Sequence, residues 1–372
     1  MTAEKTVAVD NAPEVSVVMA TYNRADSAVR LLRLLDEQTV AADRVEVIVV
    51  DDESRVPVAE AVSRARLARE PLVIRQKNGG PAVARDAGIR RARGKFIVVI
   101  DDDMLITADF VSAHLAAHAD GRRRLVLGRL HSPPGVRLPL FERLHLALLD
   151  QLFDEVATGT RRPNGVDVYT GNVSFRRDDY VAVGGFDHGL RLSEDAELGM
   201  RLERDGVEIG LSDEAFSWHV SDHSKLSGWL RRGVAYGKAE AAIARKHEAT
   251  QAIPVWRYLL LVNLVSRPFL LGSALMPAVF VPMARLVMLL AMLFGQLRLE
   301  RVALAGATLA YGILYFAGVG LDAGSWRVSG REFGRFMATT DSTTLGGAGR
   351  LVQKVARIAL GVLSNEVAIR SE

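Results

Sequence analysis

Apolar positions follow two different patterns along the chain. From about residue 13 to residue 250, short apolar runs alternate with amphipathic, charged segments. The first runs are Val15–Met19, Val45–Val50, Leu72–Arg75 and Phe96–Ile100, and the segments Asp26–Gln38, Val58–Arg69 and Ala82–Ala92 between them have helical periodicity. Short continuous apolar runs separated by helices are typical of parallel strands buried on both faces. The pattern predicts an α/β domain over 13–250 with a Rossmann-like, mainly parallel sheet.

Residues 251–325 carry long apolar stretches and few charges, which predicts membrane-embedded helices. Val302–Gly320 has no charged residue and approaches the about 20 residues needed to cross a bilayer. Pro268–Gln296 exceeds one span and contains Pro277, Pro282 and Arg285, so a tilted span, a broken pair and a re-entrant element all fit. A buried helical core is the alternative for the whole region.

Basic residues flank the apolar region on both sides. Arg231, Arg232, Arg245 and Lys246 precede it, and Arg327, Arg331 and Arg335 follow it. Basic flanks favour a cytoplasmic location, so we expect two spans and an α/β domain at the cytoplasmic face of the cell membrane.

The two ends of the chain are predicted to lie outside the folded core. Residues 1–12 are polar, lack the apolar core of a secretory signal, and are expected to be flexible. Residues 326–372 are predicted to form an amphipathic C-terminal tail. Its segment Arg350–Ser364 has apolar residues at helical spacing with cations between them. Such a helix fits an anionic membrane surface, or equally a packing site on the soluble domain.

Composition excludes several classes of protein. Hydrophobic residues make up 49% of the 372 residues and charged residues 24%, which excludes intrinsic disorder. The net charge of +3 gives no indication of a nucleic-acid partner. With no cysteine, disulfides, Cys-ligated zinc and a thiol nucleophile are excluded.

Polar residues gather where the predicted strands end. Thr21 and Tyr22 follow the first strand, Asp51 and Asp52 the second, and Asp101, Asp102 and Asp103 the fourth; Arg85 lies in the helix between the last two. Parallel sheets bind ligands at the carboxyl ends of their strands. Carboxylates crowded there repel one another unless a cation lies among them, and oxygen ligands favour Mg²⁺ or Mn²⁺. The sequence therefore predicts a divalent cation that binds a diphosphate.

Six ordered motifs resemble those of one enzyme family. They are VSVVMATYNR (15–24), VIVVDDES (47–54), NGGPAVARDAGIRRARGKFIVVIDDD (78–103), TGNVSFRR (170–177), VGGFDHGLRLSEDAELGMRLERDG (183–206) and WHVSDH (218–223). In this order and spacing, the chain from Val15 to about Gly237 resembles the family 2 glycosyltransferases, which have the GT-A fold. The resemblance implies a GT-A catalytic domain followed by a helical, membrane-associated C-terminal region.

The resemblance assigns donor-binding roles to the strand ends. It implies that Thr21, Tyr22 and Asp52 hold the nucleotide base, that Asp51 shapes the turn, and that Arg85 contacts the donor. Two residues depart from the family pattern: Asp86 stands where Asn is usual, and Glu53 stands where Gly is usual.

The resemblance also implies a metal site on the Asp-x-Asp element. Asp103 would ligate the metal, while Asp102 or Asp101 would face the ribose or the sugar. In several members a histidine at the position of His219 completes this site. A packed or surface role is the alternative for a lone histidine.

The resemblance makes Asp195 the general base, with Glu194 second. The alternative is structural, because acidic residues after Ser193 also suit the first turn of a helix. Gly171–Asn172 and Gly184–Gly185 fit the family's acceptor-side loop and the turn before the base, and ordinary turn geometry explains these glycines equally well.

The resemblance thus implies an inverting, metal-dependent transferase that moves a sugar from a nucleotide-diphosphate sugar, with UDP favoured. The acceptor would be a hydroxyl of a lipid-linked molecule, a glycan or a small molecule, and membrane lipids would be partners. Two alternatives belong to other classes. A haloacid-dehalogenase-like phosphatase would use Asp101 as nucleophile, and a membrane scaffold would bind sugar nucleotides without turnover.

Overall fold

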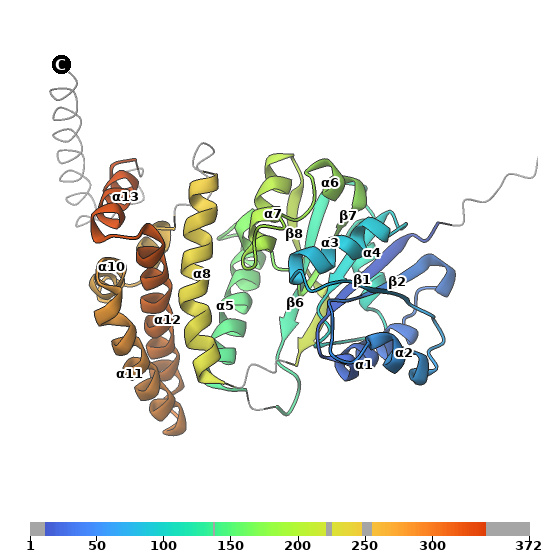
Figure 1. The fold of residues 1–372 in the computed structure, drawn as a ribbon, viewed down its shortest axis with the longest axis horizontal. Coiled ribbons are helices and arrows are strands. Elements are labelled where there is room, and N and C mark those ends of the chain that lie inside the picture. Colours follow the sequence, from blue (N-terminus) through green and yellow to red (C-terminus); the bar gives the residue numbers. More distant parts are fainter. Residues whose placement is uncertain (1–11, 137, 221–224, 248–254, 340–372) are drawn as a thin grey trace, which may run out of the picture. The chain divides into compact units, whose positions relative to one another are not determined.

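A computed structural model describes residues 12–136, 138–220, 225–247 and 255–339. The chain divides into two compact units, one of residues 1–138 and 145–222 and the other of residues 139–144 and 223–372 (Figure 1). Nearly all of the predicted flexible segment 1–12, and all of the predicted amphipathic helix Arg350–Ser364, lie outside the described residues.

The first unit is built on an eight-stranded sheet with the order β3-β2-β1-β4-β7-β6-β8-β5. The strands are β1 (Val15–Thr21), β2 (Val45–Asp51), β3 (Leu72–Arg75), β4 (Phe96–Ile100), β5 (Met104–Ile106), β6 (Arg124–His131), β7 (Asn172–Arg176) and β8 (Glu208–His219). Strands β3, β2, β1 and β4 are parallel, as the apolar runs predict. The other half is mixed, because β7 runs antiparallel to both β4 and β6, and β5 runs antiparallel to β8.

Helices connect and cover these strands. They are α1 (Ala25–Asp36), α2 (Val58–Ala65), α3 (Pro81–Arg91), α4 (Phe110–Ala116), α5 (Leu140–Ala157), α6 (Arg177–Ala182) and α7 (Glu194–Arg204), with short 3-10 turns at Ala42–Arg44 and Gly165–Asp167. Helix α2 ends earlier than the predicted Arg69, because Arg66 adopts a left-handed conformation with φ of 49°.

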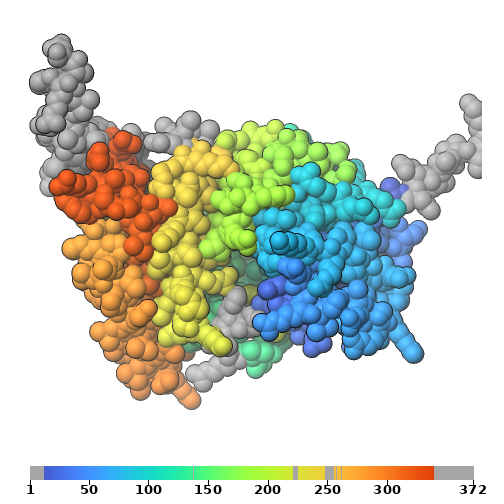
Figure 2. All heavy atoms as spheres, in the orientation of Figure 1, coloured from blue at the N-terminus to red at the C-terminus, as the bar shows by residue number. Residues whose placement is uncertain are grey.

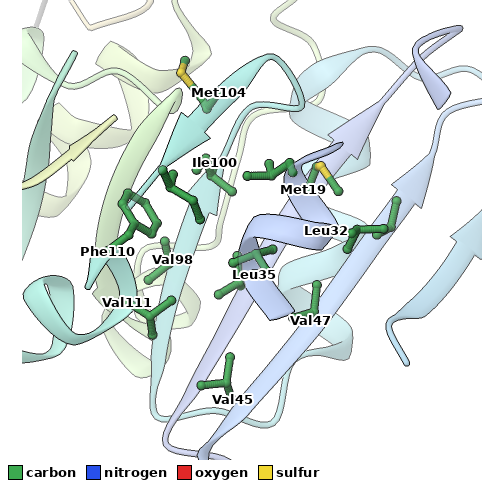
Figure 3. Close-up of a cluster of buried hydrophobic side chains, with 14 of the residues drawn as sticks. Met19, Leu32, Leu35, Val45, Val47, Val98, Ile100, Met104, Phe110 and Val111 are labelled. Atoms are coloured by element: carbon green, nitrogen blue, oxygen red, sulfur yellow. The ribbon is translucent and has the colours of Figure 1, made fainter. Parts of the chain in front are cut away.

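Two apolar cores lie on opposite faces of the sheet. Met19, Val47 and Val98 pack with Leu32 and Leu35 of α1 on one face (Figure 3). On the other face, Val18, Ile48 and Val99 share a core with residues of α3 and α7. Successive residues of a strand point to opposite faces, so strands apolar at nearly every position bury both. This three-layer α/β/α packing leaves the carboxyl ends of β1, β2 and β4 to carry polar side chains.

The second unit is helical. Its described helices are α8 (Leu226–Lys246), α9 (Arg257–Leu261), α10 (Arg267–Leu275), α11 (Pro277–Gln296), α12 (Glu300–Ala323) and α13 (Trp326–Thr339). Of the helices that the structure describes, α11 and α12 are long and apolar enough to cross a membrane, by length and composition alone. The expected interruption within 268–296 falls between α10 and α11 at Met276, whereas Pro282 lies inside α11.

Helix α8 packs closely along α12. A Cβ at Gly237 would lie 1.9 Å from the Tyr315 carbonyl oxygen, and one at Gly318 would lie 2.2 Å from that of Val234. Only glycine permits such an approach of two backbones. Helix α8 therefore belongs to the helical unit, which begins again at residue 223. The sequence suggests a later domain boundary, at residue 250.

Candidate active site

Asp51 holds the turn after β2. Its carboxylate accepts hydrogen bonds from the backbone N–H groups of Ser54 (2.8 Å) and Val58 (3.2 Å), and it forms an ion pair with Arg75 at 2.6 Å. Burial raises the pKa of Asp51, but the Ser54 hydrogen bonds, the Val58 N–H and Arg75 together bring it below its ordinary value. Asp51 is thus ionised, and both of its carboxylate oxygens are already bonded to other groups of the chain.

The carboxylate of Asp52 also accepts hydrogen bonds from other groups of the chain. One carboxylate oxygen accepts from the Gly79 N–H at 3.0 Å and from Gln76 Nε2 at 2.8 Å, and the other accepts from the Gly80 N–H at 2.9 Å. Gly80 has φ of 88°, a conformation that favours glycine. Asp52 therefore orders the loop that starts α3, and a bond to a nucleotide base would be added to these contacts or replace one of them.

The loops after β1 and β2 are linked side by side. The Asn23 N–H donates to Ser54 Oγ at 2.8 Å, and Asn23 Oδ1 accepts from the Arg55 N–H at 2.8 Å. Beside them the Tyr22 side chain is 51% exposed, so its ring is open to a stacking partner. Glu53 has φ of 67°, which explains why glycine suits this position, and its carboxylate accepts from the Asn78 N–H.

Arg85 joins the end of β4 to the start of α7. Its Nη2 lies 2.7 Å from Asp101 Oδ1, and its Nη1 lies 2.9 Å from Glu194 Oε1. Arg85 and Glu194 are both buried. The pair is separated by more than one hundred residues in sequence, so the fold brings the Asp-x-Asp element and the predicted base to one place.

Asp195 lies next to this ion-pair network in the first turn of α7. Burial, and then the negative charge of Glu194, raise the pKa of Asp195 to about 7, although the Ala196 N–H and Arg85 oppose the shift. Ser193 has φ of 56° and makes no side-chain capping hydrogen bond. A carboxyl group with a pKa near neutrality is suited to general-base chemistry.

Asp102 and Asp103 share Arg24. The Arg24 Nη1 atom lies 3.1 Å from Asp102 Oδ1 and 2.8 Å from Asp103 Oδ2. Burial and the nearby Asp103 charge raise the pKa of Asp102 to about 6, despite Arg24. Burial also raises the pKa of Asp103, but His219 and Arg24 bring it below its ordinary value. The buried Thr21 hydroxyl lies beside Asp102 and, like Arg24, opposes the rise of its pKa.

His219 reaches Asp103 through the sheet. Strand β8 pairs with β5 so that His219 faces Met104, and the Val220 N–H donates to the Asp103 carbonyl at 2.9 Å. As a result His219 Nε2 lies 3.5 Å from Asp103 Oδ2. The fold thus places the two predicted metal ligands together.

The donor set fits a divalent cation shared with a substrate. Asp103 Oδ1 is buried and has no hydrogen-bond partner, so one ligand oxygen is available beside His219. In the part of the chain that the structure describes, no three His, Asp or Glu side chains form a complete metal cage. Mg²⁺ and related ions commonly take one or two protein ligands and complete their shell with phosphates and water, which matches this arrangement.

Arg24 is a site residue that sequence reasoning did not identify. A signal for it exists in the register of β1 and β4, where Val15 pairs with Phe96 and Val18 with Val99. Continued by three residues, this register puts Thr21 level with Asp102, and Arg24 follows within reach of both acids. The Arg24 guanidinium forms ion pairs with the carboxylates that a divalent cation would bind.

We expect Arg24→Gln to tighten the binding of Mn²⁺ in the absence of nucleotide by about 10-fold, because it removes a competing positive charge worth roughly 1.4 kcal/mol. Titration followed by the Mn²⁺ electron paramagnetic resonance signal measures this. Arg55→Gln, at an exposed position in the neighbouring loop, is the control and should leave the affinity unchanged. Weaker binding in Arg24→Gln would mean that Arg24 holds Asp103 in its binding orientation.

Two other residues noted in the sequence analysis, Asn172 and Asp86, bond to other residues of the fold. Asn172 is fully buried and bonds to His114 Nε2 at 2.8 Å and to the Ala215 carbonyl at 2.8 Å, so it lies in the core rather than on an acceptor loop. Asp86 accepts from the Tyr180 hydroxyl at 2.6 Å and contacts His188 and Arg90. An aspartate at this position is explained by these three partners.

Gly171 and Gly185 each permit close packing of the backbone against a neighbouring side chain. A Cβ at Gly171 would lie 3.3 Å from Asp101 Oδ2. Gly185 has φ of 74°, and a Cβ there would lie 2.9 Å from Asp86 Oδ1.

Comparison with known proteins identifies the family of the first unit. Residues 16–183 match the family described as glycosyl transferase family 2. The succinoglycan biosynthesis protein ExoO of Rhizobium meliloti is 34% identical over 149 residues, which cover 39% of this chain and 42% of that protein. A validoxylamine A glucosyltransferase of Streptomyces hygroscopicus subsp. jinggangensis is 32% identical over 241 residues, or 57% of this chain and 56% of that protein.

Two further comparisons define the extent of the likeness. A pre-mycofactocin glycosyltransferase of Mycobacterium tuberculosis is 27% identical over 237 residues, which cover 63% of this chain and 48% of that protein. The chain thus spans about half the length of the curated relatives that it matches. Among solved structures, the mannosyltransferase PcManGT of Pyrobaculum calidifontis, in complex with GDP-Man and Mn²⁺, has a similar fold. Its TM-score is 0.57 at 19% identity, and the alignment covers 83% of this chain and 87% of that one.

The mixed sheet, the ordered motifs and these matches agree: residues 16–183 of the first unit form a glycosyl transferase family 2 domain, and this unit has the GT-A fold.

Proposed function

We propose that the chain is an inverting, metal-dependent glycosyltransferase that moves a sugar from a nucleotide-diphosphate sugar to a hydroxyl group. The observation that carries this proposal is the bridge from Asp101 through Arg85 to Glu194. It ties the Asp-x-Asp element, whose Asp103 would hold the cation, to Glu194, the neighbour of the proposed base Asp195.

Asp195 would act as the base. Its carboxylate takes the proton of the acceptor hydroxyl while the acceptor oxygen attacks the anomeric carbon from the face opposite the diphosphate. The bond from that carbon to the diphosphate oxygen breaks, and the nucleoside diphosphate leaves with the bonding electrons. A single in-line displacement inverts the configuration of the anomeric carbon. Glu194, held by Arg85, sustains the raised pKa that suits Asp195 to this transfer.

Asp103 and His219 would hold the divalent cation, with Mg²⁺ or Mn²⁺ expected. When bound, this cation neutralises the charge that develops on the diphosphate leaving group. Thr21, the exposed Tyr22 and Asp52 line the strand ends where the base would bind, and Asp101 and Asp102 would face the ribose or sugar. The Mn²⁺ in the PcManGT complex supports a divalent cation. UDP remains the favoured nucleotide, with GDP as the first competitor to test.

The acceptor is proposed to be a lipid-linked molecule, a glycan or a small molecule met at the cytoplasmic face of the membrane. The apolar helices α11 and α12 support membrane association, and the relative named for succinoglycan biosynthesis supports a role in cell-envelope glycan synthesis. A membrane-bound enzyme meets a membrane-bound acceptor at a high effective concentration.

A screen of sugar nucleotides tests the proposal. Purified full-length chain is incubated with UDP-, GDP- and dTDP-sugars and Mn²⁺ or Mg²⁺, and release of nucleoside diphosphate is measured with and without membrane lipid extracts. We expect one donor to be hydrolysed slowly, and faster with an acceptor. Binding of a donor without turnover across the panel would support the silent scaffold instead, and trapping of a phosphoryl group on Asp101 would support the phosphatase.

A further inference from the structure

The two apolar helices of the second unit differ in their surroundings. In the most apolar 18-residue stretch of α12, 56% of the residues are buried. In the corresponding stretch of α11, 22% are buried. One side of α12 packs on α11 at Ala291, Ala303 and Ala307, together with the first residues of α5. Helix α11 lies at the surface of this unit (Figure 2). The two helices are therefore not equivalent members of a membrane hairpin.

The partner of α12 on another side is a charged helix. Gly233 of α8 meets Leu314, Gly237 meets Tyr315, and the Tyr315 hydroxyl donates to Glu240 at 2.6 Å. Near the end of α12, Arg245 forms an ion pair with Asp322. Arg231, Arg232 and Lys238 are exposed on the same helix. If α12 crossed a bilayer, Arg231, Arg232 and Glu240 would lie on a helix packed against the span, where ionised side chains are costly.

The exposed apolar residues of α11 form one stripe. Val279, Leu286, Leu290 and Leu293 of α11, and Leu297 directly after its last residue, are exposed and follow each other at intervals of seven, four, three and four residues. These intervals place them on one face of a helix over a length of about 27 Å. Phe269 of α10 is also exposed, and Arg285 and Arg298 are exposed cations at the flank and end of the stripe.

We infer that the helical unit lies on the membrane rather than crossing it. The stripe of α11 enters the boundary between headgroups and acyl chains of an anionic bilayer, α11 lies in the plane of the surface, and α12 and α8 form the layer above it. An apolar stripe next to cations is typical of such interfacial helices. This inference rests on the membrane association in the proposed function, and it replaces the two expected spans with a single inserted face.

Single-cysteine labelling distinguishes the two arrangements, because the chain has no cysteine of its own. Gln296→Cys places a thiol at the end of α11, and Ser325→Cys places one after the far end of α12. Each full-length variant is labelled with a membrane-impermeant maleimide in right-side-out and in inverted vesicles of the expressing cells. We expect both thiols to react only in inverted vesicles. Reaction of the two thiols from opposite sides would overturn the inference in favour of a crossing hairpin.

A second measurement tests the stripe itself. Leu290→Asp should lower co-sedimentation with vesicles of phosphatidylglycerol and phosphatidylethanolamine by about 10-fold or more, the effect of withdrawing one leucine from an apolar phase. Val181→Asp, at an exposed apolar position of α6, is the matched control and should bind as the parent chain does. Unchanged binding of Leu290→Asp, or a soluble dimer that Leu290→Asp dissociates, would overturn the inference.

These measurements are independent of catalysis. The donor screen in detergent with a soluble acceptor reports on the proposed activity alone, and labelling and co-sedimentation report on the membrane face alone. A chain that transfers sugar but is labelled from both sides would refute only the membrane inference. One that binds vesicles but turns over no donor would refute only the proposed function.

Discussion

Replacing Asp195 by asparagine should reduce sugar transfer by about 10²–10⁴-fold, the usual contribution of a general base. Asparagine is close in shape to aspartate but cannot accept the proton of the acceptor hydroxyl. The loss should fall on kcat, because the substrates still bind. The measurement is steady-state transfer with the donor found in the screen, at saturating acceptor.

The pH dependence gives this prediction a second readout. Because the pKa of Asp195 is raised to about 7, the ionised fraction of the base increases through that pH, so transfer by the parent chain should rise as the pH increases through about 7. The Asp195→Asn variant should lose this rise.

The free energy of unfolding should fall over the pH range in which transfer rises. A carboxyl group whose pKa is raised in the folded state binds more protons there than in the unfolded chain, so it lowers the free energy of unfolding as the pH rises from about 4 to about 7. Asp195→Asn should remove this decline in the free energy of unfolding. A variant that is at least as stable as the parent chain near pH 7 cannot owe its lost activity to unfolding. Asp26→Asn, in the first turn of α1 at an exposed position, is the matched control. Full transfer by Asp195→Asn would end the assignment of the base.

Replacing Asp103 by asparagine should abolish measurable Mn²⁺ binding and reduce transfer by about 10³-fold or more, since a metal ion contributes several kcal/mol of charge stabilisation to such a reaction. Asp103 supplies the buried oxygen without a hydrogen-bond partner, and an amide oxygen is a much weaker ligand for a divalent cation. Isothermal titration with Mn²⁺ in the presence of the nucleoside diphosphate measures the loss directly.

Two controls make the Asp103 result specific. Removal of metal from the parent chain by EDTA should match the defect of Asp103→Asn, and added Mn²⁺ should restore only the parent chain. Asp109→Asn changes an exposed aspartate at the start of α4, so it should bind Mn²⁺ normally. Transfer that survives EDTA and Asp103→Asn alike would show that Arg24, which already bridges Asp102 and Asp103, suffices to neutralise the diphosphate.

Local pattern was sufficient for the parallel half of the first unit. The apolar runs predict β1 to β4 within a few residues, because strands buried on both faces need apolar side chains at nearly every position. The same reasoning places Asp51, Asp52 and Asp101–Asp103 at strand ends, since parallel strands share the edge at which they end. Family motifs then supply roles for these residues. Helix ends were less accurate, as at α2, where the backbone conformation of Arg66 ends the helix before the amphipathic pattern ends.

What the amino-acid order determined by itself was the succession of apolar runs and the acids that follow them. Only the tertiary structure decided which of these acids have partners. The pairing of β5 with β8 brings His219 to Asp103, and the fold brings Arg85 to Glu194 and Arg24 to both Asp102 and Asp103. Likewise, only packing distinguished α11 from α12, whose compositions are alike. The physical reason is that apolar periodicity is set by near neighbours, whereas ion pairs and exposure depend on segments far apart in sequence that meet only when the chain folds.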